Sequence, residues 1–117
     1  MANENPPDDT YLYLTTTGRK SGQPRHIEIW FVEHGGCYYM VAEGRENAHW
    51  VRNILHNPAV TFSVGRRAAR EETRPLAAAR GRTIRPAAEP ALAAAVSALM
   101  DAKYGWSDGL IVELRPI

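Results

Sequence analysis

Alternation of side-chain character dominates the chain between residues 10 and 42. In "TYLYLTTT" (residues 10–17), Tyr and Thr alternate with Leu and Thr, and this run of β-forming residues predicts a strand with two different faces. "RHIEIWFVE" (25–33) and "CYYMVA" (37–42) have strand-like patterns as well, and each follows a stretch rich in glycine or proline. Three strands joined by short turns predict an antiparallel meander.

The apolar spacing changes to a helical period in two places. Residues 43–58 predict a short amphipathic helix that stops at Asn57 and Pro58, with an apolar face of Trp50, Val51, Ile54 and Leu55. Residues 88–105 predict a longer helix that starts near Pro90 and ends at Gly105, with a stripe formed by Leu92, Val96, Leu99, Met100 and Lys103.

Three more strands complete the pattern. We expect them at residues 59–65, around 76–84 and at 109–117, with a polar loop leading through Pro75. The resulting order is β-β-β-α-β-β-α-β, a mainly β chain with two helices. The chain does not open on strand–helix alternation, and about six short antiparallel strands favour a small barrel that hides its edges. The helices would plug or flank this barrel.

Length and composition predict one domain. "MANENPPDD" (1–9) is polar and broken by proline, so we expect a flexible N-terminal arm followed by a single domain at 10–117. A chain of 117 residues leaves apolar surface uncovered, and a homodimer would be one way to cover it. No apolar stretch is long enough to cross a bilayer and no signal peptide is visible, so we expect a cytoplasmic protein without a membrane partner.

The charge pattern gives no reason to expect a nucleic-acid partner. The formal net charge is only +1. Seven arginines lie between residues 66 and 85, but no aromatic residue among them could stack on a base, so this run favours a solvated, mobile loop.

Metal and nucleophilic chemistry find little support in the sequence. Four histidines and Cys37 do not form a set with zinc-site spacing, so we expect no metal. There is no G-x-S-x-G elbow, and the single Cys37 excludes an intrachain disulfide and is expected to be a buried structural thiol.

A basic turn is the most informative local feature. "GRKSGQPR" joins the first two predicted strands and presents four donor side chains, Arg19, Lys20, Ser21 and Arg25. These donors match phosphate or carboxylate oxygens, although the same composition occurs in many solvated hairpins. A second turn, Gly44-Arg45, precedes the short helix, whose N-terminal N–H groups could face the same anion.

Together these stretches resemble a known family. "YLYLTTTGRKSGQPRHIEIWFVEHGGCYYMVAEG", "HWVRNILHNPAVTFSVG" and "KYGW" are similar to the deazaflavin-dependent nitroreductase family, which belongs with the pyridoxamine-phosphate oxidases to the split-barrel flavin-binding group. The resemblance implies a split β-barrel that uses deazaflavin, coenzyme F-420, to reduce a small unsaturated, quinone or nitro acceptor. The coenzyme would carry the hydride, so no catalytic triad is expected.

The resemblance also implies a set of site residues. The cofactor phosphate or its glutamyl tail would lie against Arg19, Lys20, Ser21 and Arg25, with Gly44, Arg45, Trp50 and Asn53 lining the same groove. If a proton is added to the product, Tyr104 is the candidate donor, and the alternative is that it is a core aromatic residue at the end of the helix. Two alternatives stay open: an FMN-dependent oxidoreductase of the same barrel group, and a barrel that binds a flavin or another anion without turnover.

Overall fold

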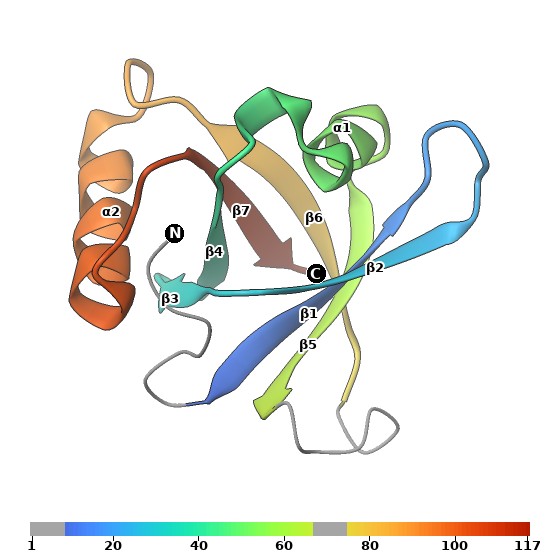
Figure 1. The fold of residues 1–117 in the computed structure, drawn as a ribbon, viewed down its shortest axis with the longest axis horizontal. Helices are drawn as coiled ribbons and strands as arrows, with labels where there is room; N and C mark the ends of the chain where they lie inside the picture. The colour runs from blue at the N-terminus through green and yellow to red at the C-terminus, as the bar shows by residue number, and fades with distance from the viewer. Residues whose placement is uncertain (1–8, 67–74) are drawn as a thin grey trace.

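The chain folds around one antiparallel sheet, seen in a computed structural model that describes residues 9–66 and 75–117 (Figure 1). The seven strands pair in the order β2-β1-β5-β6-β7-β4-β3. Their bounds are β1 Thr10–Thr17, β2 Pro24–Ile29, β3 Val32–His34, β4 Cys37–Ala42, β5 Ala59–Arg66, β6 Ala77–Ile84 and β7 Leu110–Pro116. The helices are α1 (His49–His56), preceded by the short 3-10 helix η1 (Arg45–Asn47), and α2 (Pro90–Tyr104). The predicted mainly β class with two helices is confirmed.

One continuous run of chain closes this sheet into a barrel. β2 pairs with β1 at one edge, and β3 pairs with β4 at the other edge. Between them, the backbone of Phe31 bonds to a side chain: its N–H donates to the Tyr104 hydroxyl at 3.1 Å, and that hydroxyl donates to the Phe31 carbonyl at 2.9 Å. The single strand predicted at 25–33 is therefore two strands, and the count rises to seven.

α1 closes one end of the barrel (Figure 1). Its Val51 and Ile54 are buried in the interior core beside the inward-facing residues of the strands, among them Leu12, Leu14, Met40, Phe62, Val112 and Leu114. Close approach requires a glycine opposite the helix, because a Cβ on Gly81 would lie 2.9 Å from Ile54 Cγ2. This plug fixes where the polar face of α1 meets the β1–β2 turn.

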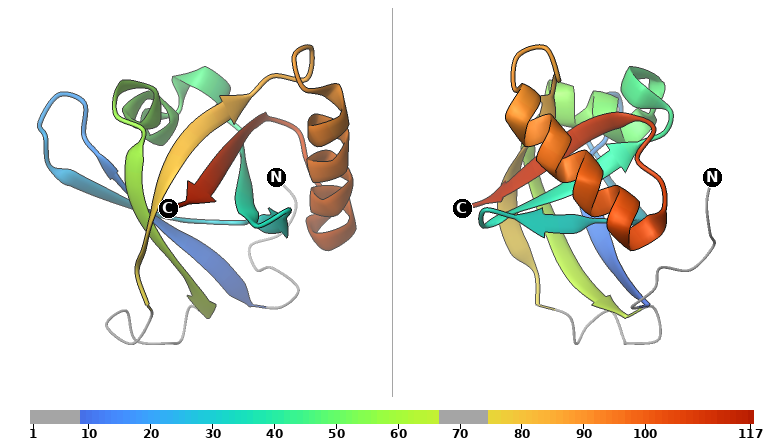
Figure 2. Two further views of the ribbon diagram at one scale, coloured as in Figure 1. Left: turned by 180° about the vertical axis from the view of Figure 1, so that it is seen from behind. Right: turned by 90° about the vertical axis from the view of Figure 1, so that its left-hand side faces the viewer.

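α2 flanks the barrel instead of entering it (Figure 2). The residues that it buries are Ala93, Val96, Met100 and Tyr104, which pack on the outer face of the sheet with Trp30, Val32, Cys37, Tyr39, Ile84 and Ile111. The buried face of α2 differs in part from the predicted stripe, because Leu99 was expected to be buried and is 37% exposed. Cys37 is buried, as predicted.

The second half of the chain follows the predicted order. β5, β6 and β7 lie where strands were expected, including the strand within the alanine- and arginine-rich segment. The arm at 1–8 and most of the loop before Pro75, residues 67–74, lie outside the described residues. In the part that the structure describes, no helix is long and apolar enough to cross a membrane.

Candidate functional site: a cation-lined groove

The basic turn between β1 and β2 is a closed hairpin loop. Gly18 N–H donates to the Gln23 carbonyl at 2.8 Å, and Gly22, with a φ of 72°, donates to the Gly18 carbonyl at 2.8 Å. Ser21 Oγ accepts hydrogen bonds from the Gln23 N–H and from Arg25 Nη2, each at 3.2 Å. These bonds hold Ser21 and Arg25 together across the turn.

Arg19 ties this turn to α1. Its Nη1 donates to Asn53 Oδ1 at 2.9 Å, and its backbone N–H donates to the same oxygen at 3.2 Å. Its Nη2 lies 3.2 Å from Nδ1 of His49, one helical turn earlier. The guanidinium therefore lies across the polar face of α1 in a fixed orientation.

Asn53 is the anchor of this arrangement. Its side chain is almost fully buried, and its Nδ2 donates to Thr16 Oγ1, also buried, at 3.1 Å. Both ends of the amide are thus used, one by β1 and one by Arg19. Asn53 acts by positioning Arg19 and is not itself a surface donor.

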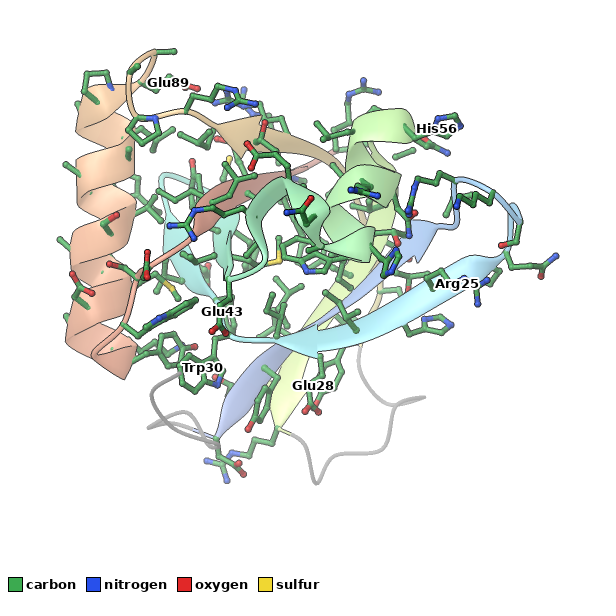
Figure 3. The ribbon with its side chains drawn as sticks, turned by 45° about the horizontal axis from the view of Figure 1, so that its top comes forward. Arg25, Glu28, Trp30, Glu43, His56 and Glu89 are labelled. Atoms are coloured by element: carbon green, nitrogen blue, oxygen red, sulfur yellow. The ribbon has the colours of Figure 1, made fainter. Side chains whose placement is uncertain are left out.

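A groove of about 400 Å³ lies between the turn and α1. Its wall consists of Gly18, Arg19, Lys20, Ser21, Arg25, Ile27, His49, Trp50 and Asn53. Three cationic side chains line it, and none of the described lining residues is a carboxylate, whereas Ile27 and Trp50 add apolar surface. In Figure 3, Arg25 extends from the hairpin end of β2. His56, also labelled there, is the last residue of α1.

Six of the predicted cofactor-binding residues come together here. They are Arg19, Lys20, Ser21, Arg25, Trp50 and Asn53. Gly44 and Arg45 do not line this groove. Arg45, with a φ of 52°, points to Asp108 and forms an exposed ion pair at 2.8 Å. The turn before η1 thus joins the segment that leads into β7.

Tyr104 lies apart from the groove. It is buried between α2 and the outer face of the sheet, and its ring stacks on Trp30 with centroids 4.4 Å apart. Its hydroxyl is bonded twice to the backbone of Phe31. These contacts hold Tyr104 in the core between α2 and the sheet. Its role as proton donor stays a prediction and is not used in the function proposed below.

Sequence reasoning missed two residues of the site, His49 and Thr16. His49 and Asn53 are four residues apart, a spacing that places both on one face of a helix. That signal was present in the sequence. Thr16 carried none, because the bond to Asn53 joins residues 37 positions apart.

A buried ionic cluster lies outside this groove. Glu113 on β7 is buried and accepts hydrogen bonds from Arg82 Nε at 2.9 Å and from the Tyr39 hydroxyl at 2.8 Å. Burial opposes ionisation, but the bonds from Arg82 and Tyr39 outweigh it and hold the pKa of Glu113 below its usual value. Burial, and then the bond to Glu113, raise the pKa of Tyr39. Arg82 also pairs with Glu89 at 2.8 Å.

We expect Asn53→Ala to lower the free energy of unfolding by about 2 kcal/mol, because Thr16 and the Arg19 N–H each lose a buried partner. Urea denaturation followed by tryptophan fluorescence measures this loss. Asn47→Ala is the matched control, an exposed amide near the same helix, with an expected change below about 0.5 kcal/mol. Equal stabilities of the two variants would contradict the anchoring role.

Comparison with known proteins agrees with this architecture. The heme storage protein HutZ from Vibrio cholerae superimposes with a TM-score of 0.73 at 21% identity, covering 93% of this chain and 82% of that one. An F420 reductase superimposes with a TM-score of 0.61 at 24% identity, covering 93% of this chain and 87% of that one. A putative pyridoxamine 5'-phosphate oxidase from Listeria innocua superimposes with a TM-score of 0.64 at 12% identity, covering 91% of this chain and 82% of that one. At these identities the likeness establishes the fold.

The fold is that of a split β-barrel oxidoreductase. A family model narrows this class. The model of the F420H(2)-dependent quinone reductase family matches residues 4–98, and the chain belongs to that family. It is a deazaflavin-dependent oxidoreductase, as the resemblance implied.

Proposed function

We propose that the cation-lined groove holds the anionic tail of coenzyme F-420, and that the protein passes hydride from the reduced coenzyme to a small quinone, nitro or unsaturated acceptor. The observation that carries this proposal is the convergence of Arg19, Lys20 and Arg25 on one groove that has no carboxylate among its described lining residues. A phosphate or glutamyl carboxylate would offset their charges.

The donor set fits such a tail. Arg19 offers a guanidinium charge held in place by Asn53, and Lys20 adds an exposed point charge from the turn. Gly18 allows the tight turn, because a Cβ there would lie 2.7 Å from Ser21 Oγ. Ile27 and Trp50 give the groove apolar surface suited to the uncharged part of a ligand.

The chain's own contribution is binding and orientation. The reduced coenzyme supplies the hydride when bound, and the protein supplies charge complementarity and a fixed position. Val51 and Ile54 hold α1 at the barrel end, so the groove wall that it forms is anchored in the core. No described side chain in the groove needs to act as a catalytic base.

We expect Arg19→Ala combined with Lys20→Ala to weaken coenzyme F-420 binding by about ten-fold or more, because two charge-assisted contacts are lost. The melting temperature should change little, since Asn53 keeps the Arg19 backbone N–H as a partner. Titration of the purified protein while following deazaflavin fluorescence measures the affinity.

The matched control removes the same charge elsewhere. Arg66→Ala with Arg80→Ala deletes two cations on exposed strand positions that do not line the groove, so the affinity should stay within about two-fold of the wild type. Equal affinity of the Arg19/Lys20 variant and the wild type would overturn the proposed site. If the protein bound FMN saturably and did not bind coenzyme F-420, FMN would be its cofactor. If it bound coenzyme F-420 but did not reduce a soluble quinone, it would be a binding protein without turnover.

A further inference from the structure

We propose that His49 is a proton-linked anion ligand of the groove, so that an anion binds together with a proton taken up by this imidazole. The inference rests on the proposed function, because it concerns the same groove. It adds a residue that the sequence pattern did not assign, and it makes ligand affinity dependent on pH.

The hydrogen bond between Arg19 and His49 defines the protonation state of the ring in this geometry. A guanidinium has only donors and stays protonated in proteins. Nδ1 of His49, 3.2 Å from Arg19 Nη2, must therefore be the acceptor. This contact requires an Nδ1 without a proton, which leaves Nε2 as the position of the ring proton.

Protonation of His49 changes this contact into a repulsive one. Both ring nitrogens of a charged imidazole are donors, so Nδ1–H would then face the N–H of Arg19 Nη2. Nη1 keeps its bond to Asn53 Oδ1 at 2.9 Å. Arg19 thus remains anchored through one nitrogen, while the other becomes available to a ligand oxygen.

The surroundings couple this change to an anion. The hairpin turn contributes Arg19, Lys20 and Arg25, and β2 contributes the uncharged Ile27. From α1, the lining residues other than His49 are the uncharged Trp50 and Asn53. Arg52, on the same helix, bonds instead to the Glu46 carbonyl and to Asn47 Oδ1.

With three cations and no carboxylate along the described wall, a fourth positive charge is unfavourable unless an anion is present. Histidine is the side chain whose charge changes most readily between pH 5 and pH 8. Proton uptake and anion binding therefore favour each other, and the coupling is reciprocal.

Sulfate is a suitable probe because its charge is constant between pH 5.5 and pH 8. We expect wild-type protein to bind sulfate about five-fold or more tightly at pH 5.5 than at pH 8, from groove amide shifts in NMR titrations. His49→Gln keeps an acceptor for Arg19 but cannot take up a proton, so its affinity should change less than about two-fold over this range.

His56→Gln is the matched control. It removes a histidine from the last turn of the same helix, outside the groove, and should retain the full pH dependence of the wild type. Equal pH dependence in His49→Gln and the wild type would overturn the role of His49 while leaving the anion site intact. Absence of sulfate-dependent shifts in the groove at both pH values would overturn the anion site itself, and with it this inference.

Discussion

Arg82→Ala is expected to lower the free energy of unfolding by about 3 kcal/mol at pH 7, because it leaves the buried carboxylate of Glu113 without its main partner. The Glu113 side chain is only 2% exposed, and Arg82 donates to both of its oxygens, at 2.9 and 3.2 Å. The loss is limited by the Tyr39 hydroxyl and by Arg115 Nε, 3.7 Å away. Chemical denaturation followed by circular dichroism measures it.

Arg85→Ala is the control for this variant. Arg85 pairs with Glu46 at 3.4 Å, and because both side chains are largely exposed, the loss should stay below about 1 kcal/mol. If both variants lost the same free energy of unfolding, the burial of Glu113 would not explain the effect of Arg82→Ala.

The same pair gives the stability a definite pH dependence. Because the pKa of Glu113 is lowered in the folded protein, its contribution is present above the unfolded value of about 4.3 and is lost as the pH falls through the folded value. The stability difference between the wild type and Arg82→Ala should therefore shrink as the pH is lowered from about 7 toward 3. A difference independent of pH would contradict the ionic origin.

Local pattern was sufficient to predict most of the fold. Alternation and helical spacing are properties of neighbouring residues, and β1, β4, β5 and α1 follow from them. The break between β2 and β3 does not, because the residue that satisfies the backbone of Phe31 is Tyr104, 73 positions later. A partner so distant leaves no periodic signal.

For the candidate site, too, local features could be predicted from the sequence and distant contacts could not. The donors of the basic turn are adjacent in sequence, so their convergence could be predicted from the glycines that fold the turn. Arg45 was expected in the groove on equal compositional grounds, yet it pairs with Asp108, which lies far along the chain. Composition identifies arginines that can bind an anion, and tertiary contacts decide which of them are available.

α1 connects the core to the site. One face buries Val51 and Ile54 in the barrel, and another presents His49 and Asn53 to the basic turn. A helix of eight residues has little stability of its own, so its position depends on the barrel end that it plugs. Groove geometry therefore depends on how tightly the strands pack beneath this helix.

Gly109→Ala is expected to cost about 3 kcal/mol, because β7 enters the sheet where no side chain fits. A Cβ on Gly109 would lie 2.7 Å from Val41 Cγ1 and 2.8 Å from the carbonyl carbon of Ala42, and the backbone of β4 cannot move without losing its pairing with β7. Thermal unfolding measures the loss. Gly44→Ala is the matched control: its nearest atoms would lie 3.6 Å away, so it should be almost neutral, and equal losses would contradict the steric argument.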